Sequence, residues 1–353
     1  MKLRAFNKAL LALLLAAGFA VRAQTQAQTA SCDFDKSTLS FHGSAIDQAK
    51  CLLRRVLPGG TLGPPLRDLP DPLGKLIDKP VTVSKTTLRR YLVAQGIDEP
   101  ALGGSIDEPL SRGRDNDPQA PLARYFVIHD TSTPNLCASQ GFPIDMDQAS
   151  WEWNHLNKYV DSGNAHLYIT RDGVSIRPQN RTFQTPWRAT KLEGPGTDLR
   201  AKGMFLHIEN VQPRRCDPDP SQPGGFEPDR RYYELDQKTS QWRCRNDRIA
   251  PEPGLSPRQQ ERLALVYITA SVRRGQWLIP AFHAAVDAGI PDAHDDPQNF
   301  DLREWADAIN ALLASINAGA SGTKLKPNGH GNGRSHKARR HPVQRSDRCV
   351  GSA

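Results

Sequence analysis

The chain has 353 residues, of which 38% are hydrophobic and 24% charged, and this composition is typical of a soluble globular protein with one large domain or two. The formal net charge of +8 is unevenly distributed: residues 1–23 carry +4 and residues 320–353 carry +7, which leaves −3 for residues 24–319. Because the central part is mildly acidic, the basic pI of about 9.2 gives no reason to expect a nucleic-acid partner.

The first segment has the pattern of an export signal. Basic residues precede an apolar run at residues 9–21, and the small residues before Ala23 have the spacing of a signal-peptidase site. We expect cleavage after Ala23, with Ala27 and Ala30 as alternatives, and a periplasmic or secreted mature protein. The apolar run is shorter than the roughly 20 residues that span a bilayer, so we favour a cleaved signal over a retained anchor.

Residues 24–122 form a proline-rich N-terminal region, in which helices are predicted at residues 44–56 and 84–95. Six cysteines in an exported chain permit disulfides, and the closest pairs in the sequence are Cys32 with Cys51 and Cys216 with Cys244. No CxxC spacing occurs, which argues against a zinc site made of cysteines.

The strongest secondary-structure signals lie between residues 123 and 319. An apolar strand at residues 124–128 ends in His129, and residues 147–160 are predicted to form a helix capped by Asp147. Residues 165–177 are predicted to form a hairpin, because an Asp-Gly turn separates two strand-like runs.

The second half of this domain continues the alternation of strands and helices. A strand is predicted at residues 203–209, followed by an insertion at residues 213–253. A helix begins at Ser256 with the spacing of a capping box, and the final helix begins at Asp301. The expected fold is α/β (α+β), with a central mixed β-sheet flanked by helices.

The basic C-terminal tail, residues 320–353, is rich in Gly, Asn, Ser and His and has no apolar periodicity. Such a segment could adhere to an anionic wall or membrane surface. It could equally be a solvated, disordered end of the chain. The sequence leaves both interpretations open.

Two histidines and five aspartates are concentrated in residues 280–302, a loop-like segment that we interpret as half of a metal site. His283 follows an apolar run, as a ligand at the end of a buried strand would. The best partner from elsewhere is His129, because a strand that delivers a histidine at its exit holds that side chain rigidly.

Five segments, in order, resemble the type 2 N-acetylmuramoyl-L-alanine amidase family, which includes bacterial zinc amidases, phage amidase lysozymes and peptidoglycan recognition proteins. The resemblance covers roughly the central 200 residues. The segments are Val-Ile-His-Asp-Thr-Ser at 127–132, Ala-His-Leu-Tyr-Ile-Thr-Arg-Asp-Gly at 165–173, Leu-His-Ile-Glu at 206–209, His283, and Asp296-Pro297 with Phe300-Asp301.

The resemblance implies that His129, His283 and Asp296 bind Zn²⁺, with Asp295 as an alternative ligand or an outer carboxylate. Three nitrogen or oxygen ligands are typical of a catalytic zinc, which lowers the pKa of a bound water to about 7. Glu209 matches the position of the general base in the bacterial members of the family.

Two positions depart from the family pattern. His294 stands where relatives place a lysine or threonine that stabilises the oxyanion, a role that a histidine can also fill. Arg188 replaces the histidine of a Trp-His-Ala segment, and it either binds a substrate carboxylate or pairs at the surface. His166 lies beside the predicted pocket and is a second candidate for substrate binding. Asp287 and Asp292 are interpreted as solvated loop residues.

The expected function is therefore that of an exported zinc amidase that hydrolyses the amide between N-acetylmuramic acid and L-alanine in peptidoglycan or muropeptides. The departures at Arg188 and His294 motivate an alternative, a peptidoglycan receptor without turnover. The insertion at residues 213–253 motivates another, a zinc hydrolase that acts on a different amide.

Overall fold

The computed structural model describes residues 32–57, 61–137, 142–161, 163–194, 199–216, 233–235, 242–244 and 254–320. The expected export signal, most of the insertion and all but the first residue of the basic tail lie outside these ranges.

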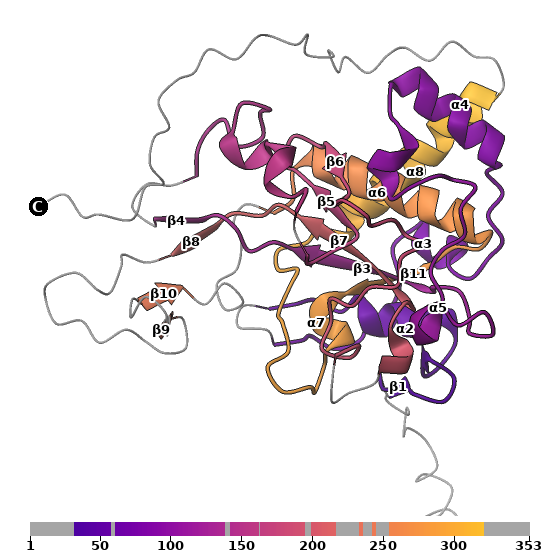
Figure 1. Cartoon of the computed structure of the whole chain (residues 1–353), viewed down its shortest axis with the longest axis horizontal. Coiled ribbons are helices and arrows are strands. Elements are labelled where there is room, and N and C mark those ends of the chain that lie inside the picture. Colours follow the sequence, from indigo (N-terminus) through magenta and orange to yellow (C-terminus); the bar gives the residue numbers. More distant parts are fainter. Residues whose placement is uncertain are drawn as a thin grey trace, which may run out of the picture.

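Five strands form the central sheet, in the spatial order β11, β3, β7, β5, β6 (Figure 1). Four of them run parallel, and β6 pairs antiparallel with β5 at one edge. The central strands are almost completely buried because helices cover both faces, as is usual for parallel sheets. The bounds are β3 (Tyr125–Asp130), β5 (Leu167–Ile169), β6 (Ser175–Ile176), β7 (Phe205–Asn210) and β11 (Ile279–Phe282).

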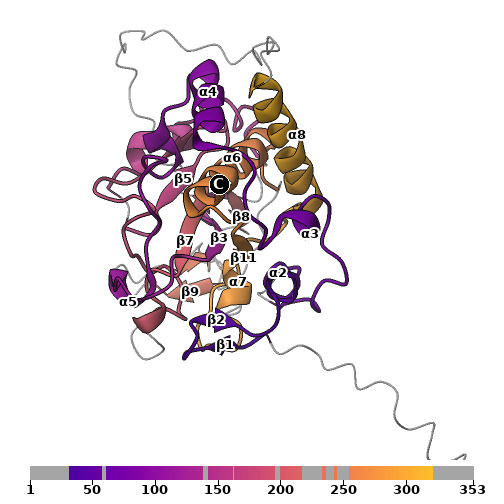
Figure 2. The ribbon, with the colours of Figure 1, turned by 90° about the vertical axis from the view of Figure 1, so that its right-hand side faces the viewer.

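Helices lie in two layers around this sheet (Figures 1 and 2). One layer contains α6 (Pro257–Arg274), α8 (Leu302–Ala320) and α4 (Lys85–Gln95), and the opposite side holds α2 (Ala45–Leu52) and α7 (His283–Val286). The expected mixed sheet flanked by helices is confirmed.

The smaller elements are short strands, helices and 3₁₀ turns. They are β1 (Phe34–Asp35), β2 (Ser40–Phe41), α3 (Leu73–Leu76), α5 (Gly113–Asn116), β4 (Asn135–Cys137), β8 (Arg214–Cys216), β9 (Tyr233–Leu235), β10 (Trp242–Cys244) and the 3₁₀ turns Glu99–Leu102, Glu152–Asn154, Leu156–Lys158 and Leu199–Ala201.

Local sequence signals explain where the long helices begin. The side chain of Ser256 accepts the backbone N–H of Gln259, whose own side chain accepts the N–H of Ser256, so the predicted capping box is present in α6. Asp301 accepts two backbone N–H groups of the first turn of α8, as expected for a helix cap.

The N-terminal region shares the hydrophobic core of the central sheet. Leu52 from α2 and Leu88 from α4 are buried in the same apolar cluster as Phe126 and Ile128 of β3. The helix predicted at residues 84–95 is present as α4, and the one predicted at residues 44–56 is present as α2 but ends at Leu52; Ser44 and Ser84 are their caps.

A disulfide joins Cys32 to Cys51, which confirms one predicted pair; the side chains of Cys216 and Cys244 lie outside the described part. Within the described part of the chain, no helix is both long and apolar enough to cross a membrane.

The helix predicted at residues 147–160 is wrong. This segment contains two short 3₁₀ turns, Glu152–Asn154 and Leu156–Lys158. The carboxylate of Asp147 does not cap a helix: it accepts a hydrogen bond at 2.6 Å from Nε of the buried Arg171, a residue from the hairpin. Asp147 therefore binds Arg171, which is distant in the sequence, and does not bind the backbone N–H groups of a following helix as the sequence pattern suggested.

Candidate metal centre

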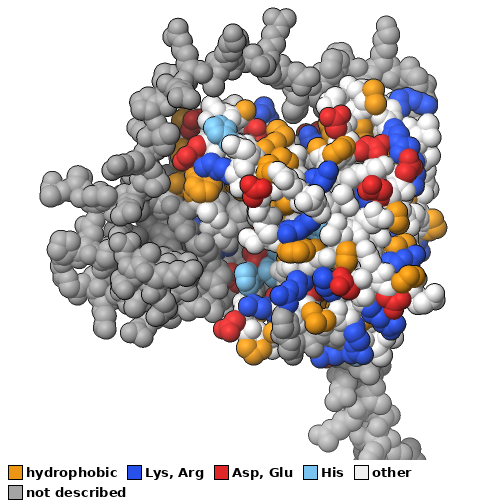
Figure 3. Space-filling view, viewed as in Figure 1, with side chains coloured by type: hydrophobic (Ala, Val, Ile, Leu, Met, Phe, Trp, Pro, Cys, Tyr) orange, Lys and Arg blue, Asp and Glu red, His pale blue; other side chains and the backbone are white. Residues whose placement is uncertain are grey.

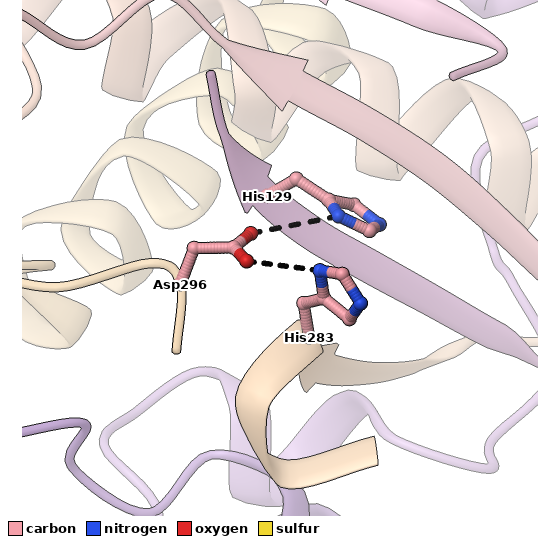
Figure 4. Close-up of side chains that lie close together, drawn as sticks. All are labelled: His129, His283 and Asp296. Atoms are coloured by element: carbon pink, nitrogen blue, oxygen red, sulfur yellow. Dashed lines mark ion pairs between the residues drawn. The ribbon is translucent and has the colours of Figure 1, made fainter. Parts of the chain in front are cut away.

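Three predicted ligands converge at the carboxyl edge of the parallel strands. His129 is near the end of β3, His283 directly follows β11, and Asp296 lies on the loop before α8. Figure 4 shows both imidazole rings turned towards the carboxylate of Asp296. Nδ1 of His283 is 2.9 Å from Oδ1 of Asp296, and Nδ1 of His129 is 3.5 Å from Oδ2.

This arrangement could hold a metal ion. One ligand atom from each of the three residues lies within 4.8 Å of the other two, and all three residues are buried. Two ligand atoms of a tetrahedral zinc site are about 3.3 Å apart, close to the separations of 2.9 and 3.5 Å between Asp296 and the two histidines. Two imidazoles and a carboxylate therefore fit a divalent transition metal.

Electrostatic coupling within the trio is strong. Burial alone would lower the pKa of His283, but the carboxylates of Asp296 and Asp287 raise that pKa well above its usual value. Burial opposes ionisation of Asp296, but the neighbouring His283 and His129 hold its pKa well below the usual range. Burial and the charge of His283 lower the pKa of His129 to about 3. At neutral pH the metal-free site therefore combines the Asp296 carboxylate with a neutral His129 and a protonated His283, and a bound metal would displace the His283 proton.

Glu209 lies next to this trio, because β7 pairs with β3 so that Glu209 is opposite His129. Its Oε2 is buried and has no hydrogen-bond partner among the described residues. Burial raises the pKa of Glu209 well above its usual value, and the negative charges of Asp296 and Asp130 raise it further. The structure thus brings the predicted general base to the predicted ligands.

A cleft of about 440 Å³ opens beside His283, one of the three candidate ligands. His294 and Arg188 line it together with His283. The ring of His294 stacks on that of His283 with centroids 4.8 Å apart, and the side chain of His294 remains 54% exposed. On the face seen in Figure 3, histidine side chains lie at the surface beside a group of lysine and arginine side chains. The cleft therefore offers hydrogen-bond donors and positive charge next to the ligands.

His166 does not line the cleft, contrary to the expectation that it binds substrate. Its side chain is fully buried: Nδ1 accepts the backbone N–H of His207, and Nε2 lies 2.9 Å from the carbonyl oxygen of Thr185. With both ring nitrogens bonded to the backbone, His166 supports the sheet behind the site.

The aspartates of the 280–302 segment take separate positions. Asp295 is buried and accepts a hydrogen bond from Gln298, so it lies outside the ligand trio. Asp292 is exposed, as expected. Asp287 is not solvated, which corrects the sequence interpretation: it is fully buried and lies 3.0 Å from Nε2 of His283. The reason is its position directly after α7 and four residues after His283, so that one helical turn brings the two side chains together.

Two further residues of the site were missed. Nδ1 of His207 lies 3.1 Å from Nε2 of His129, and Nε2 of His207 lies 2.9 Å from Oε2 of the buried Glu193. The strand pattern could have indicated His207, because residues two positions apart on a strand lie on the same face of the sheet, and His207 is two positions before Glu209. No sequence pattern indicated Glu193, which lies in a loop.

Comparison of the chain with protein-family models, with curated proteins and with solved structures finds no match.

Proposed function

We propose that this chain is a zinc-dependent N-acetylmuramoyl-L-alanine amidase that acts on peptidoglycan. One observation carries the proposal: His129, His283 and Asp296 meet at one edge of the sheet, with Glu209 on the adjacent strand, where its Oε2 has no hydrogen-bond partner among the described residues. The order of these residues along the chain, and the family resemblance described above, support the choice of amide hydrolysis.

A zinc ion in such a site acts as a Lewis acid towards a carbonyl oxygen and lowers the pKa of water. The protein residues supply the proton transfers. Glu209 takes a proton from the attacking water as oxygen adds to the amide carbon, and it passes that proton to the nitrogen of L-alanine as the C–N bond breaks. Its raised pKa suits this role, since a base works best when its pKa is near the working pH.

Two cleft residues are assigned to the substrate. His294 lies beside His283 at the cleft surface, from where it can donate a hydrogen bond to the amide oxygen as negative charge develops there. Arg188 is exposed on the cleft wall and can bind a carboxylate of the stem peptide through two parallel hydrogen bonds.

The test is digestion of purified peptidoglycan by the zinc-loaded protein, with chromatography of released stem peptides that begin with L-alanine. Replacement of Glu209 by Gln should lower the rate by at least about 100-fold while the protein keeps its zinc. Glu152→Gln is a matched control, because Glu152 is exposed on a turn outside the trio. Zinc-loaded wild-type protein that leaves peptidoglycan intact would contradict the proposal, and tight binding without product would favour the receptor alternative.

A further inference from the structure

Each histidine of the trio has a second ring nitrogen, and for His283 this nitrogen is held by a buried carboxylate. Nε2 of His283 donates to Oδ2 of Asp287 at 3.0 Å. The two oxygens of Asp287 also accept the backbone N–H groups of Lys191 and Leu192, at 2.9 and 3.0 Å. Asp287 therefore connects His283 to the loop formed by residues 188–194, which we call the support loop.

A second series of contacts leads from His129 to the same loop. Nε2 of His129 lies 3.1 Å from Nδ1 of His207, and Nε2 of His207 lies 2.9 Å from Oε2 of Glu193. Both His207 and Glu193 are fully buried. Glu193 also accepts the hydroxyl of Thr190 at 3.0 Å, which fixes its carboxyl group within the support loop.

One assignment of the ring protons satisfies both series of contacts. A histidine that offers Nδ1 to a metal carries its proton on Nε2 and needs an acceptor there, which sets the tautomer and the orientation of the ring. Asp287 is that acceptor for His283. For His129 the neighbouring group is Nδ1 of His207, which can accept when the His207 proton is on Nε2, the nitrogen that lies 2.9 Å from Oε2 of Glu193.

We propose that Asp287 and Glu193 are positioning residues of the metal centre, and that the support loop holds both metal histidines in the orientation that metal binding requires. The proposal rests on metal binding by the trio, which is part of the proposed function, but it does not depend on amidase activity. The same loop supplies Arg188 and Thr190 to the cleft wall, so the residues that face a substrate and those that orient the ligands belong to one short segment.

The test is the dissociation constant for Zn²⁺, measured by competition with a chromophoric chelator. Removing a carboxylate that orients a metal-binding histidine typically weakens metal binding about 10- to 100-fold. We expect a loss of this size for Asp287→Asn and for Glu193→Gln. Asp292→Asn is the matched control, because Asp292 is an exposed residue of the same loop-like segment and should leave zinc affinity unchanged. Unchanged affinity in Asp287→Asn and Glu193→Gln would overturn the proposal.

Absorption by the Co²⁺-loaded protein separates positioning from a purely structural role. A reoriented His283 should change the visible Co²⁺ bands of Asp287→Asn, whereas those of Asp292→Asn should match the wild type. Far-UV circular dichroism of the metal-free variants reports folding. If Asp287→Asn does not fold, the zinc affinity of Glu193→Gln decides, and loss of folding in both variants would assign these residues a structural role and refute the proposal. A chain that binds zinc as expected and leaves peptidoglycan intact would contradict only the amidase function.

Discussion

Replacing Tyr125 with phenylalanine would test how strongly the N-terminal region is held against the strand that carries His129. The Tyr125 hydroxyl accepts the backbone N–H of Phe41 and donates to Oε1 of Gln48, both at 2.9 Å. Burial raises the pKa of Tyr125 to about 12, so the hydroxyl keeps its proton at neutral pH. This single group therefore joins β2 and α2 to β3.

The expected loss of stability follows from the two groups that the substitution leaves unpaired. Gln48 cannot readily turn away, because its Nε2 is bonded to the carbonyl oxygen of Gly43 at 2.9 Å. Each unsatisfied buried polar group costs about 1–3 kcal/mol, so we expect the free energy of unfolding of Tyr125→Phe to fall by about 2–6 kcal/mol. The ring itself stays in place, because it stacks on Phe205 with centroids 4.9 Å apart.

Urea unfolding, followed by far-UV circular dichroism and extrapolated to water, measures this difference. Tyr91→Phe is the matched control, since Tyr91 is also buried but its hydroxyl has no hydrogen bond to the described part of the chain. We expect that control to stay within about 0.5 kcal/mol of the wild type. A Tyr125→Phe variant as stable as the control would refute the reasoning.

Three further predictions concern the disulfide, the buried histidines and the metal. Replacing Cys32 and Cys51 by serine should lower the free energy of unfolding by about 3 kcal/mol, since the bond closes a loop of sequence separation 19; reduced wild-type protein should match the variant in urea unfolding. Burial lowers the pKa of His166 from 6.5 to about 3, so only the unfolded chain takes up its proton as the pH falls below 6.5. Stability should therefore fall with pH, and between about pH 7.5 and 5.5 the metal-free wild type should lose about 1.4 kcal/mol more than His166→Asn in the same urea assay; equal slopes would contradict this. Zinc at about 100 times its dissociation constant should raise the free energy of unfolding by about 2.7 kcal/mol, and calorimetry should show no such gain for Asp296→Asn.

The sequence was sufficient to single out the three residues that meet in the candidate site: His129 and His283 follow apolar strands, whereas Asp296 was indicated by the family resemblance, with Asp295 as an alternative. Helix caps such as Ser256 were also predictable, since they depend on contacts within four residues.

Other residues depend on contacts that sequence patterns do not reveal. Helices cover both faces of a parallel sheet, so hydropathy does not tell which face His166 occupies, and the cleft could not be distinguished from the interior. Asp147 is paired with Arg171 across a separation of 24 residues, and Glu193 reaches His129 only through His207. These contacts exist only after the sheet has formed.

The metal centre also has a consequence for when the protein can acquire its ion. Asp130 donates its backbone N–H to Asp296 across a separation of 166 residues, and the pairing of β11 with β3 brings His283 to His129. No shorter fragment that ends before Asp296 contains the complete donor set. A chain that crosses a membrane unfolded would therefore arrive without metal, and the ion it finally holds would be chosen by the compartment in which it folds.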